Sequence, residues 1–327
     1  MSKSFVNKVL VGGALAAGAA VWAIAPRTFS DKRRNYVPAV PDVWYAHRGL
    51  HDAGSGLTAQ YANESGEYVA LARRMAMKAG YGSPSVVGAI APENSLAAFA
   101  AACEAGYGIE LDLQMTADGE IVVVHDGDLM RVAGDPRRVA DLTYDELTRI
   151  PLFPTDAPGA AVAAPLSGSL EKPPLVTTPD SAPDGYFQHV PLFADVLKVV
   201  AGRVPLIVEY KFDDNSKWGP RDVELMEKGD ALLQAYSGAY VIESFNPAAV
   251  NWYKENRPEV CRGQLSWWPQ GEEKPSDPAA LAKEYAAGAL IFDWISRPDF
   301  VAYDWHGGNS PQVRLARFMG AVPASWT

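Results

Sequence analysis

Ionisable residues stand in pairs at the ends of successive strand-like segments of this sequence. The four pairs are His47 with Arg48, Glu110 with Asp112, His125 with Asp126, and Glu209 with Lys211. Because residues two apart on a strand share a face, the two members of the second pair point together, as do those of the fourth. Any one pair could be a solvated strand end or a local salt bridge. Four pairs in succession indicate a common site.

Three of these residues are carboxylates that could hold a metal ion. Buried carboxylates without partners are costly, so a cluster of them at strand ends implies a bound cation or closely matched partners. Glu110, Asp112 and Glu209 offer hard oxygen ligands, which favours Ca²⁺ or Mg²⁺ over zinc or copper. The sequence therefore predicts a divalent-cation site formed by these three residues.

The histidines and cations of the pairs fit the cleavage of a phosphodiester. His47 and His125 could take a proton from a nucleophile and give one to a leaving alkoxide. Arg48 would bind the non-bridging phosphate oxygens through its planar fork, and Lys211 would bind them as a point charge. A lone histidine is more often a structural residue. That interpretation is given to the remaining histidines, His51, His189 and His306.

Short strands that alternate with helices would position these pairs. The candidate strands are Val43–His47, Gly108–Leu113, Ile121–His125, Pro205–Tyr210, Tyr240–Ser244, Gly263–Trp267, Phe300–Tyr303 and Val322–Trp326. Helical patterns separate most of them, which is typical of repeated βα units and a parallel sheet. Segment 300–303 could instead be an extended piece of a loop. In an α/β barrel the carboxyl ends of the strands meet at one face, where active sites form.

A helix with an apolar face is predicted directly before the second strand. It covers Ser95–Ala105, with Asn94 or Ser95 as its N-cap and Gly106 just past its end.

Two longer segments, 52–88 and 155–186, do not fit the alternation. Within the first, Glu64–Ala79 is predicted to form an extra helix. The second is rich in Pro, Ala, Gly and Ser and has no useful periodicity, as expected for a surface excursion. Both are predicted to be insertions that overhang the mouth of the barrel, although they could also be neutral loop expansions.

Composition bounds the class of protein. With 327 residues, 48% of them hydrophobic, the chain can bury one large core, and α/β barrels use about 250 residues as one domain. The formal net charge of −10 argues against a nucleic-acid partner. Cys103 and Cys261 are far apart in sequence, so neither a disulfide framework nor a thiolate metal site is supported.

The N-terminus, residues 1–35, carries an apolar run from Val9 to Ala25, preceded by two lysines and followed by four basic residues between positions 27 and 34. Three interpretations compete: a membrane anchor, a cleaved signal peptide ending in Ala23-Ile24-Ala25, and a buried helix. The positive charge after the run favours a retained transmembrane anchor with the following domain in the cytoplasm. Secretion or a cell-envelope location is the alternative.

Six ordered motifs carry a resemblance to a known family. They are Ala46-His47-Arg48-Gly49, Pro92-Glu93-Asn94-Ser95, Glu110-Leu111-Asp112, Val124-His125-Asp126, Glu209-Tyr210-Lys211 and Ser244-Phe245. This series resembles that of the glycerophosphodiester phosphodiesterases, from about Val43 to the C-terminus.

The resemblance implies a TIM-type (β/α)8 barrel, within residues 42–327, that hydrolyses glycerophosphodiesters to an alcohol and sn-glycerol 3-phosphate with a divalent cation. His47 and His125 would be the general acid and base, and the metal ligands would be those predicted above. Glu93 would orient Arg48 or the surroundings of the metal, and Trp326 would join the substrate-binding residues. Whether the substrate's own hydroxyl or water attacks phosphorus first stays open.

The resemblance also raises an expectation about the C-terminus. Relatives continue past a tryptophan-threonine strand into one more helix and strand, whereas Trp326-Thr327 ends this sequence. Without its insertions the domain is also shorter than the roughly 250 residues of a typical barrel. We therefore expect the barrel to lack its last helix and strand.

Two other functions compete with this one: a phospholipase D-like or phosphatidylinositol-cleaving enzyme on the same barrel, and a catalytically silent, membrane-anchored binding protein. The leaving-group alcohol is open, with choline, ethanolamine, envelope glycerol polymers and lysophospholipids as candidates. Trp267, Trp268 and Trp294 could line the substrate entrance, face lipid or pack in the core.

Overall fold

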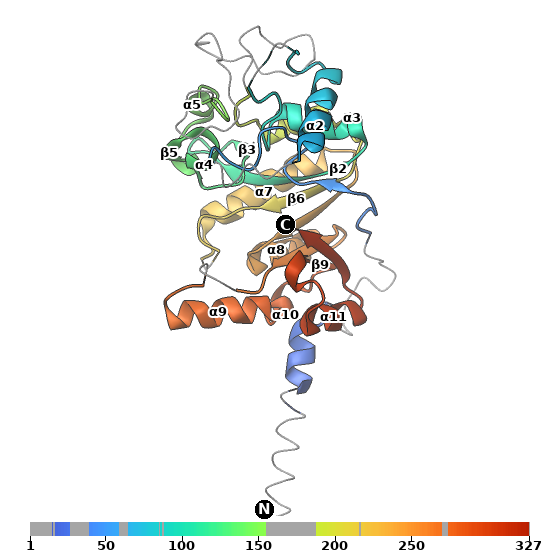
Figure 1. Cartoon of the computed structure of the whole chain (residues 1–327). Coiled ribbons are helices and arrows are strands. Elements are labelled where there is room, and N and C mark those ends of the chain that lie inside the picture. Colours follow the sequence, from blue (N-terminus) through green and yellow to red (C-terminus); the bar gives the residue numbers. More distant parts are fainter. Residues whose placement is uncertain are drawn as a thin grey trace, which may run out of the picture. The chain divides into compact units, whose positions relative to one another are not determined.

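The computed structural model of the chain describes residues 15, 17–26, 39–58, 65–84, 86, 88–154, 188–215, 217–269 and 274–326. These residues form two compact parts (Figure 1). The larger part is Pro41–Tyr240, and the smaller part combines Met1–Val40 with Val241–Thr327.

The larger part is built on three parallel strands in the order β1–β2–β6. Their bounds are Tyr45–Ala46, Gly108–Met115 and Leu206–Tyr210. The central strand, β2, is buried along its whole length, as expected for a parallel strand covered on both faces. The observed β1 is shorter than the predicted strand 43–47.

The fourth strand of this part, β3 (Ile121–Val123), pairs antiparallel with β2. The prediction that this segment is a further parallel strand is wrong. Only five residues separate Met115 from Ile121, whereas a parallel crossover needs about a dozen or more. A turn with Gly119 at φ +82° closes the hairpin instead. His125 thus follows the returning arm of a hairpin.

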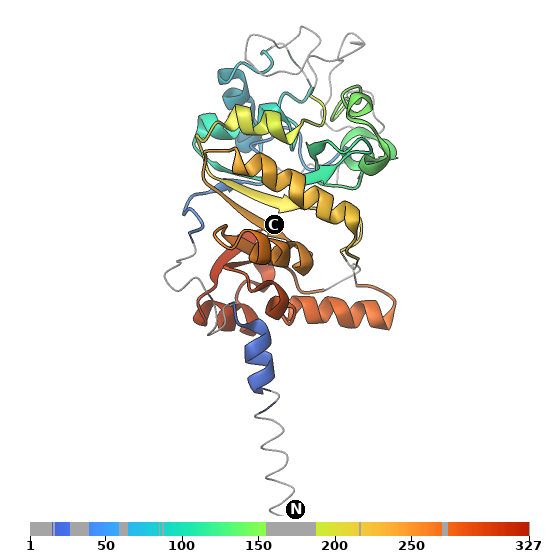
Figure 2. The same ribbon diagram turned by 180° about the vertical axis from the view of Figure 1, so that it is seen from behind.

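Helices cover this sheet and carry its connections. The longer ones are α2 (Gly66–Lys78), α3 (Leu96–Ala105), α6 (Phe193–Val200) and α7 (Pro220–Gln234). Figure 2 shows α7, coloured gold, crossing the face of the sheet. The shorter elements are the β4–β5 hairpin (Asp128–Leu129 and Asp135–Arg138), α4 (Met130–Ala133) and α5 (Tyr144–Leu147).

The predicted helix before β2 is confirmed as α3. Its N-cap is Ser95, whose hydroxyl accepts a hydrogen bond from the amide of Ala98, and Gly106 ends it at φ +78°. The extra helix predicted within segment 52–88 is confirmed as α2, capped by Ser65. The second predicted insertion, 155–186, lies outside the described residues.

The smaller part contains four parallel strands in the order β7–β8–β9–β10. They are Tyr240–Ser244, Arg262–Ser266, Phe300–Asp304 and Val322–Trp326, and the helices are α8 (Pro247–Asn256), α9 (Pro278–Gly288), α10 (Asp293–Ser296) and α11 (Pro311–Phe318). Segment 300–304 is a strand paired on both sides, so the alternative of a loop is wrong.

Residues 17–24 are helical, and of these only Ala23 and Ile24 are buried. Ile24 is buried in a cluster with Leu290 of the α9–α10 connection and Val313 of α11. Within the described residues no helix is long and apolar enough to cross a membrane, so the predicted transmembrane helix is not supported. Residues 9–14 and 16 of the apolar run lie outside the described residues.

Candidate active site

A left-handed turn after β1 places the first pair of site residues. Arg48 (φ +55°) and Gly49 (φ +83°) both adopt this conformation, and the Arg48 amide donates to Oε2 of Glu110 at 3.0 Å. A Cβ at position 49 would lie 2.9 Å from Cβ of Ala98. Glycine is therefore required for the chain to turn against α3.

Three buried carboxylates come from two adjacent parallel strands. Glu110 and Asp112 lie on β2, and Glu209 of β6 stands in register with Asp112. A carboxylate oxygen of Glu110 and one of Glu209 lie within 4.8 Å of each other. Carboxylate oxygens this close together could share a divalent cation.

Lys211 neutralises part of this negative charge. Its Nζ lies 3.2 Å from Oδ1 of Asp112 and 2.8 Å from Oε1 of Glu209. Burial nevertheless raises the pKa of Glu209 to about 7, against the opposing effect of the ammonium. The pKa of Asp112 is lowered despite its burial, because Lys211 is close. The single positive charge of Lys211 therefore does not neutralise all the buried carboxylates of the site.

The carboxylate of Glu93 orients the guanidinium of Arg48. Its Nη1 donates to both carboxylate oxygens of Glu93 at 3.2 Å, and its Nε lies 3.6 Å from Oδ2 of Asp112. Arg131 binds Glu93 as well, with Nη1 at 2.9 Å and Nη2 at 2.6 Å. Burial disfavours the ionised form of Glu93. Arg48 and Arg131 outweigh this effect, so the pKa of the Glu93 carboxyl is lowered.

The same Arg131 also reaches the second histidine. Its Nε donates to Oδ2 of Asp126 at 2.5 Å, and Oδ1 of Asp126 lies 2.6 Å from Nδ1 of His125. Asp126 is ionised, because its neighbours lower its pKa despite partial burial, and so it accepts a proton-bearing Nδ1. Burial lowers the pKa of His125. Its Nε2 is then the nitrogen that can accept a proton.

His47 lies beside the carboxylates. Its Nε2 is 3.8 Å from Oε2 of Glu110, and 42% of its side chain is exposed. Partial removal from water and the charge of Arg48 lower the pKa of His47 to about 3. Both imidazoles are therefore neutral at pH 7 and can act as bases.

Comparison with known proteins identifies the family. The sequence profile of the glycerophosphoryl diester phosphodiesterase family matches residues 87–327 of this chain. The chain belongs to this family. One relative is a glycerophosphodiester phosphodiesterase of Caldanaerobacter subterraneus, 45% identical over 60 residues, or 18% of this chain and 25% of that protein. The matched segment thus spans about a quarter of that relative.

Two solved structures share the TIM-barrel-like fold of the family. One, from Silicibacter pomeroyi, has a TM-score of 0.50 at 24% identity and covers 77% of this chain and 86% of the other. The second is an Oleispira antarctica phosphodiesterase in complex with its product, sn-glycerol-3-phosphate, with a TM-score of 0.52, 15% identity and coverages of 87% and 84%. At these identities the likeness establishes the fold alone.

Most residues predicted from the sequence of this family member lie together in its larger part. They are His47, Arg48, Glu93, Glu110, Asp112, His125, Glu209 and Lys211. Trp326 lies on β10 of the smaller part, where its ring packs edge-on against Phe245 with centroids 5.6 Å apart. Their roles in catalysis and binding stay predictions.

Two further residues of the site were not selected from the sequence. Arg131 is one, because it binds both Glu93 and Asp126. The other is Asn94, whose Nδ2 donates to Oδ2 of Asp112 at 2.8 Å and whose backbone is left-handed at φ +53°. Its side chain orients a carboxylate, and Ser95 caps the helix.

Glu243 of β7 is a further buried carboxylate, in the smaller part.

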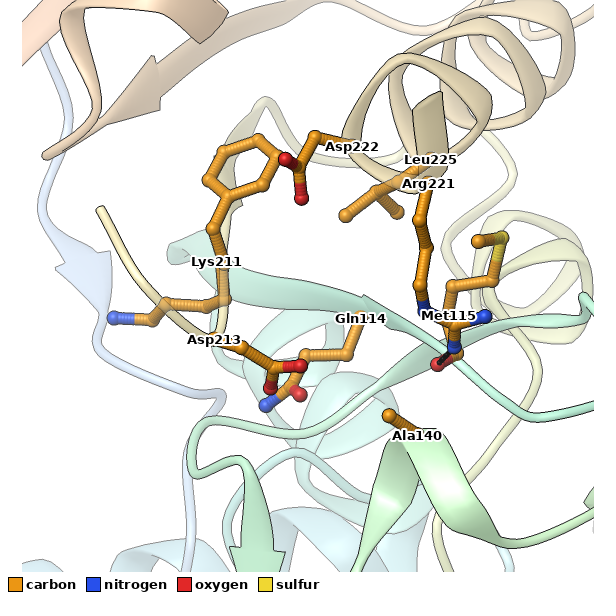
Figure 3. Close-up of a pocket in the computed structure, with 9 residues that line it drawn as sticks. Gln114, Met115, Ala140, Lys211, Asp213, Arg221, Asp222 and Leu225 are labelled. Carbon is orange, nitrogen blue, oxygen red and sulfur yellow. Dashed lines mark hydrogen bonds between the residues drawn. The ribbon is translucent and has the colours of Figure 1, made fainter. Parts of the chain in front are cut away.

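A small pocket opens beside Lys211 (Figure 3). Gln114, Asp213, Arg221 and Asp222 contribute its polar lining. Arg221 is held there by the carbonyls of residues 115 and 116. In Figure 3 the ammonium of Lys211 points away from these residues, in keeping with its ion pairs to the carboxylates of the site.

Proposed function

We propose that this chain hydrolyses glycerophosphodiesters to an alcohol and sn-glycerol 3-phosphate. Membership of the glycerophosphoryl diester phosphodiesterase family supports the reaction class, and the product bound to the Oleispira antarctica neighbour supports the product. The observation that carries the proposal is the convergence of Glu110 and Glu209 with His47, Arg48 and the carboxylate-oriented His125.

The carboxylates fit a hard divalent cation, Ca²⁺ or Mg²⁺. Glu110 and Glu209 would hold it, with Asp112 as the third predicted ligand, and burial raises the pKa of Glu209. When bound, the cation would supply positive charge to the phosphate oxygens and favour ionisation of an attacking hydroxyl. The remaining steps belong to side chains of this chain.

Two proton transfers accompany the exchange of bonds at phosphorus. One imidazole of His47 and His125 removes the proton of the attacking hydroxyl as its oxygen bonds to phosphorus. The other imidazole, which is neutral at pH 7 in the free protein and must first take up a proton, gives that proton to the alkoxide as the bond from phosphorus to the alcohol breaks. Arg48 and Lys211 bind the non-bridging oxygens. The attacking hydroxyl belongs either to water or to the glycerol of the substrate.

The assay is release of glycerol 3-phosphate from glycerophosphocholine, with and without excess chelator. We expect Glu209→Gln to lower kcat by roughly 10²-fold or more, since it removes one carboxylate from a metal shell. Glu224→Gln on α7 is the matched control, because its side chain is 49% exposed. Full activity in chelator, or in Glu209→Gln, would refute the metal assignment. Absence of product from every glycerophosphodiester would refute the function.

We also infer that the N-terminal segment near Val9–Ala25 stays attached and holds the enzyme at a membrane, with the catalytic domain in the cytoplasm. The basic residues after the run support this orientation. The contacts of Trp22 and Ala25 with Arg297 support retention, because cleavage after Ala25 would remove them. A mature N-terminus mapped by mass spectrometry to just beyond Ala25 would refute this inference.

A further inference from the structure

Arg297 fastens the end of the N-terminal helix to the smaller part. Its Nη1 donates to the carbonyl oxygens of Trp22 at 2.7 Å and Ala25 at 2.6 Å, which are acceptors that a helix end leaves without partners. The same guanidinium lies 4.7 Å from the centroid of the Trp22 ring. Ile24 completes the attachment, because it is buried in a cluster with Val313 and Ala316 of α11. Tertiary contacts therefore hold the C-terminal end of this helix.

Large apolar side chains are exposed around this attachment. Trp22 and Trp294 stack with ring centroids 5.9 Å apart, yet remain 55% and 47% exposed, and Ile291 and Phe318 are 42% and 89% exposed. Single exposed apolar residues are ordinary, but several on neighbouring elements mark an interaction surface. We call these four residues, together with Arg314 and Arg317, the anchor face.

Helix α11 adds positive charge to the anchor face. Its inner side buries Val313 and Ala316, whereas Arg314, Arg317 and Phe318 are exposed on the outer side. Within the described part of the chain neither arginine makes an ion pair. Tryptophan beside basic residues is the composition of protein surfaces at the boundary between lipid and water.

We propose that the anchor face lies on an anionic lipid bilayer. Two observations favour a lipid bilayer as the partner of this face. The apolar sequence continues without interruption from Val21 back to Val9, which is a composition suited to lipid. The exposed Arg314 and Arg317 complement anionic headgroups, in a chain whose net charge of −10 would otherwise repel them. The inference rests on the proposed membrane attachment and adds the surface that meets the lipid.

The test places the photoreactive residue p-benzoylphenylalanine at position 318 of the full-length protein, bound to vesicles of three parts phosphatidylcholine and one part phosphatidylglycerol. Flotation of the vesicles first measures attachment. Illumination then yields lipid adducts that are counted by mass spectrometry. The matched control carries the same probe at Lys198, which is 71% exposed in the larger part. We expect lipid adducts at position 318 and few at position 198.

Charge reversal tests the role of the arginines. Arg314→Glu with Arg317→Glu should lower adduct formation by roughly five-fold or more for each arginine, whereas Arg149→Glu with Lys198→Glu, at exposed positions of the larger part, should not. The protein could float with the vesicles while the probe at 318 gives no more lipid adduct than the probe at 198. That result would refute contact between the anchor face and lipid, but not the membrane attachment. If it does not float, both fail. Protein–protein adducts at 318 would overturn the proposal in favour of self-association.

Discussion

At the scale of single residues, Arg131 supports both Arg48 and His125. Its guanidinium binds both oxygens of Glu93, which orients Arg48, and one oxygen of Asp126, which orients His125. A third contact goes to the carbonyl of Ser55. Planar guanidinium groups suit such multiple contacts, which an ammonium group cannot reproduce. The phosphate clamp and the proton-transfer residue therefore share one support.

Arg131→Met should lower kcat by roughly 10–100-fold with a smaller effect on KM, because neither Arg48 nor His125 would be held in place. Arg131→Lys should restore part of the loss. The pH dependence of kcat is the decisive measurement, since a displaced Asp126 no longer sets the ionisation of His125. Arg149→Met, at an exposed position, is the control. A variant with reduced Tm but a normal kcat and pH profile would reduce Arg131 to a structural residue.

The two site histidines give a second prediction at this scale. His47→Ala and His125→Ala should each lower kcat by about 10²–10⁴-fold, the usual contribution of a general acid or base. His306→Ala should have little effect, because its ring is 56% exposed and contacts its chain neighbours Asp304 and Trp305. Steady-state kinetics at several pH values, with circular dichroism to verify folding, provide the check. Near-normal turnover in His125→Ala alone would contradict a two-histidine mechanism.

Among the secondary-structure elements, the β2–β3 hairpin does most to place the site. Strand β2 presents Glu110 and Asp112 on one face, and its next residue on that face, Gln114, donates hydrogen bonds to the carbonyls of residues 124, 125 and 126. Gln114 therefore fixes the backbone of His125 relative to the carboxylates. A hairpin achieves this over a short stretch of chain, whereas a parallel crossover would separate the two pairs by a helix.

Helix α10 carries an isolated buried acid. Asp293 is 1% exposed, and neither of its carboxylate oxygens has a hydrogen-bond partner among the described residues. Burial raises its pKa well above the ordinary value of 3.8, although Arg297 acts in the opposite direction. The folded chain therefore keeps a proton on Asp293 at pH values where the unfolded chain has lost it.

Asp293→Asn should stabilise the protein at neutral pH, because the amide resembles the protonated acid. Below pH 3.8 the carboxyl is protonated in both states. As the pH rises above 3.8, the free energy of unfolding falls until the pH passes the folded pKa. Thermal unfolding should show a Tm higher in the variant by about 2–4 °C for each 1 kcal/mol gained, with a flatter profile between pH 4 and 7. Asp145→Asn, at an exposed position, is the control. An unchanged pH profile would contradict the shift.

At the scale of the whole molecule, the apolar N-terminus has a structural role besides any contact with lipid. Ile24 is 7% exposed within the core cluster of the smaller part, and Arg297 has its two carbonyl acceptors there. Loss of this segment would uncover that cluster and leave the Arg297 guanidinium with fewer partners.

Removal of residues 1–26 should therefore lower the free energy of unfolding, with the burial of one isoleucine alone contributing about 1.5–3 kcal/mol. Removal of residues 1–14 is the control, since it shortens the apolar run and keeps the contacts of Trp22, Ile24 and Ala25. Thermal unfolding of both truncated proteins in the same detergent measures the difference. Equal Tm values would show that the docked helix end does not stabilise the fold.

Sequence patterns alone predicted much of this protein. The strand-end pairs, the cap of α3 and the ordered motifs are local, because period-two alternation and capping act over a few residues. They were sufficient to predict the family, the strands β7 and β10 with their bounds, and the residues that meet in the larger part. The pairing direction of β3 was also within reach, since its connection to β2 is too short for a parallel crossover.

Tertiary structure alone decided which charges meet. That one guanidinium serves both Glu93 and Asp126, that Lys211 balances Asp112 and Glu209, and that Asn94 binds Asp112 rather than capping α3 all depend on side chains distant in sequence. The same holds for Arg297, which binds carbonyls more than 270 residues away. Coulombic and hydrogen-bond energies depend on separation in space and on burial, and neither is encoded in the local spacing of residues along the chain.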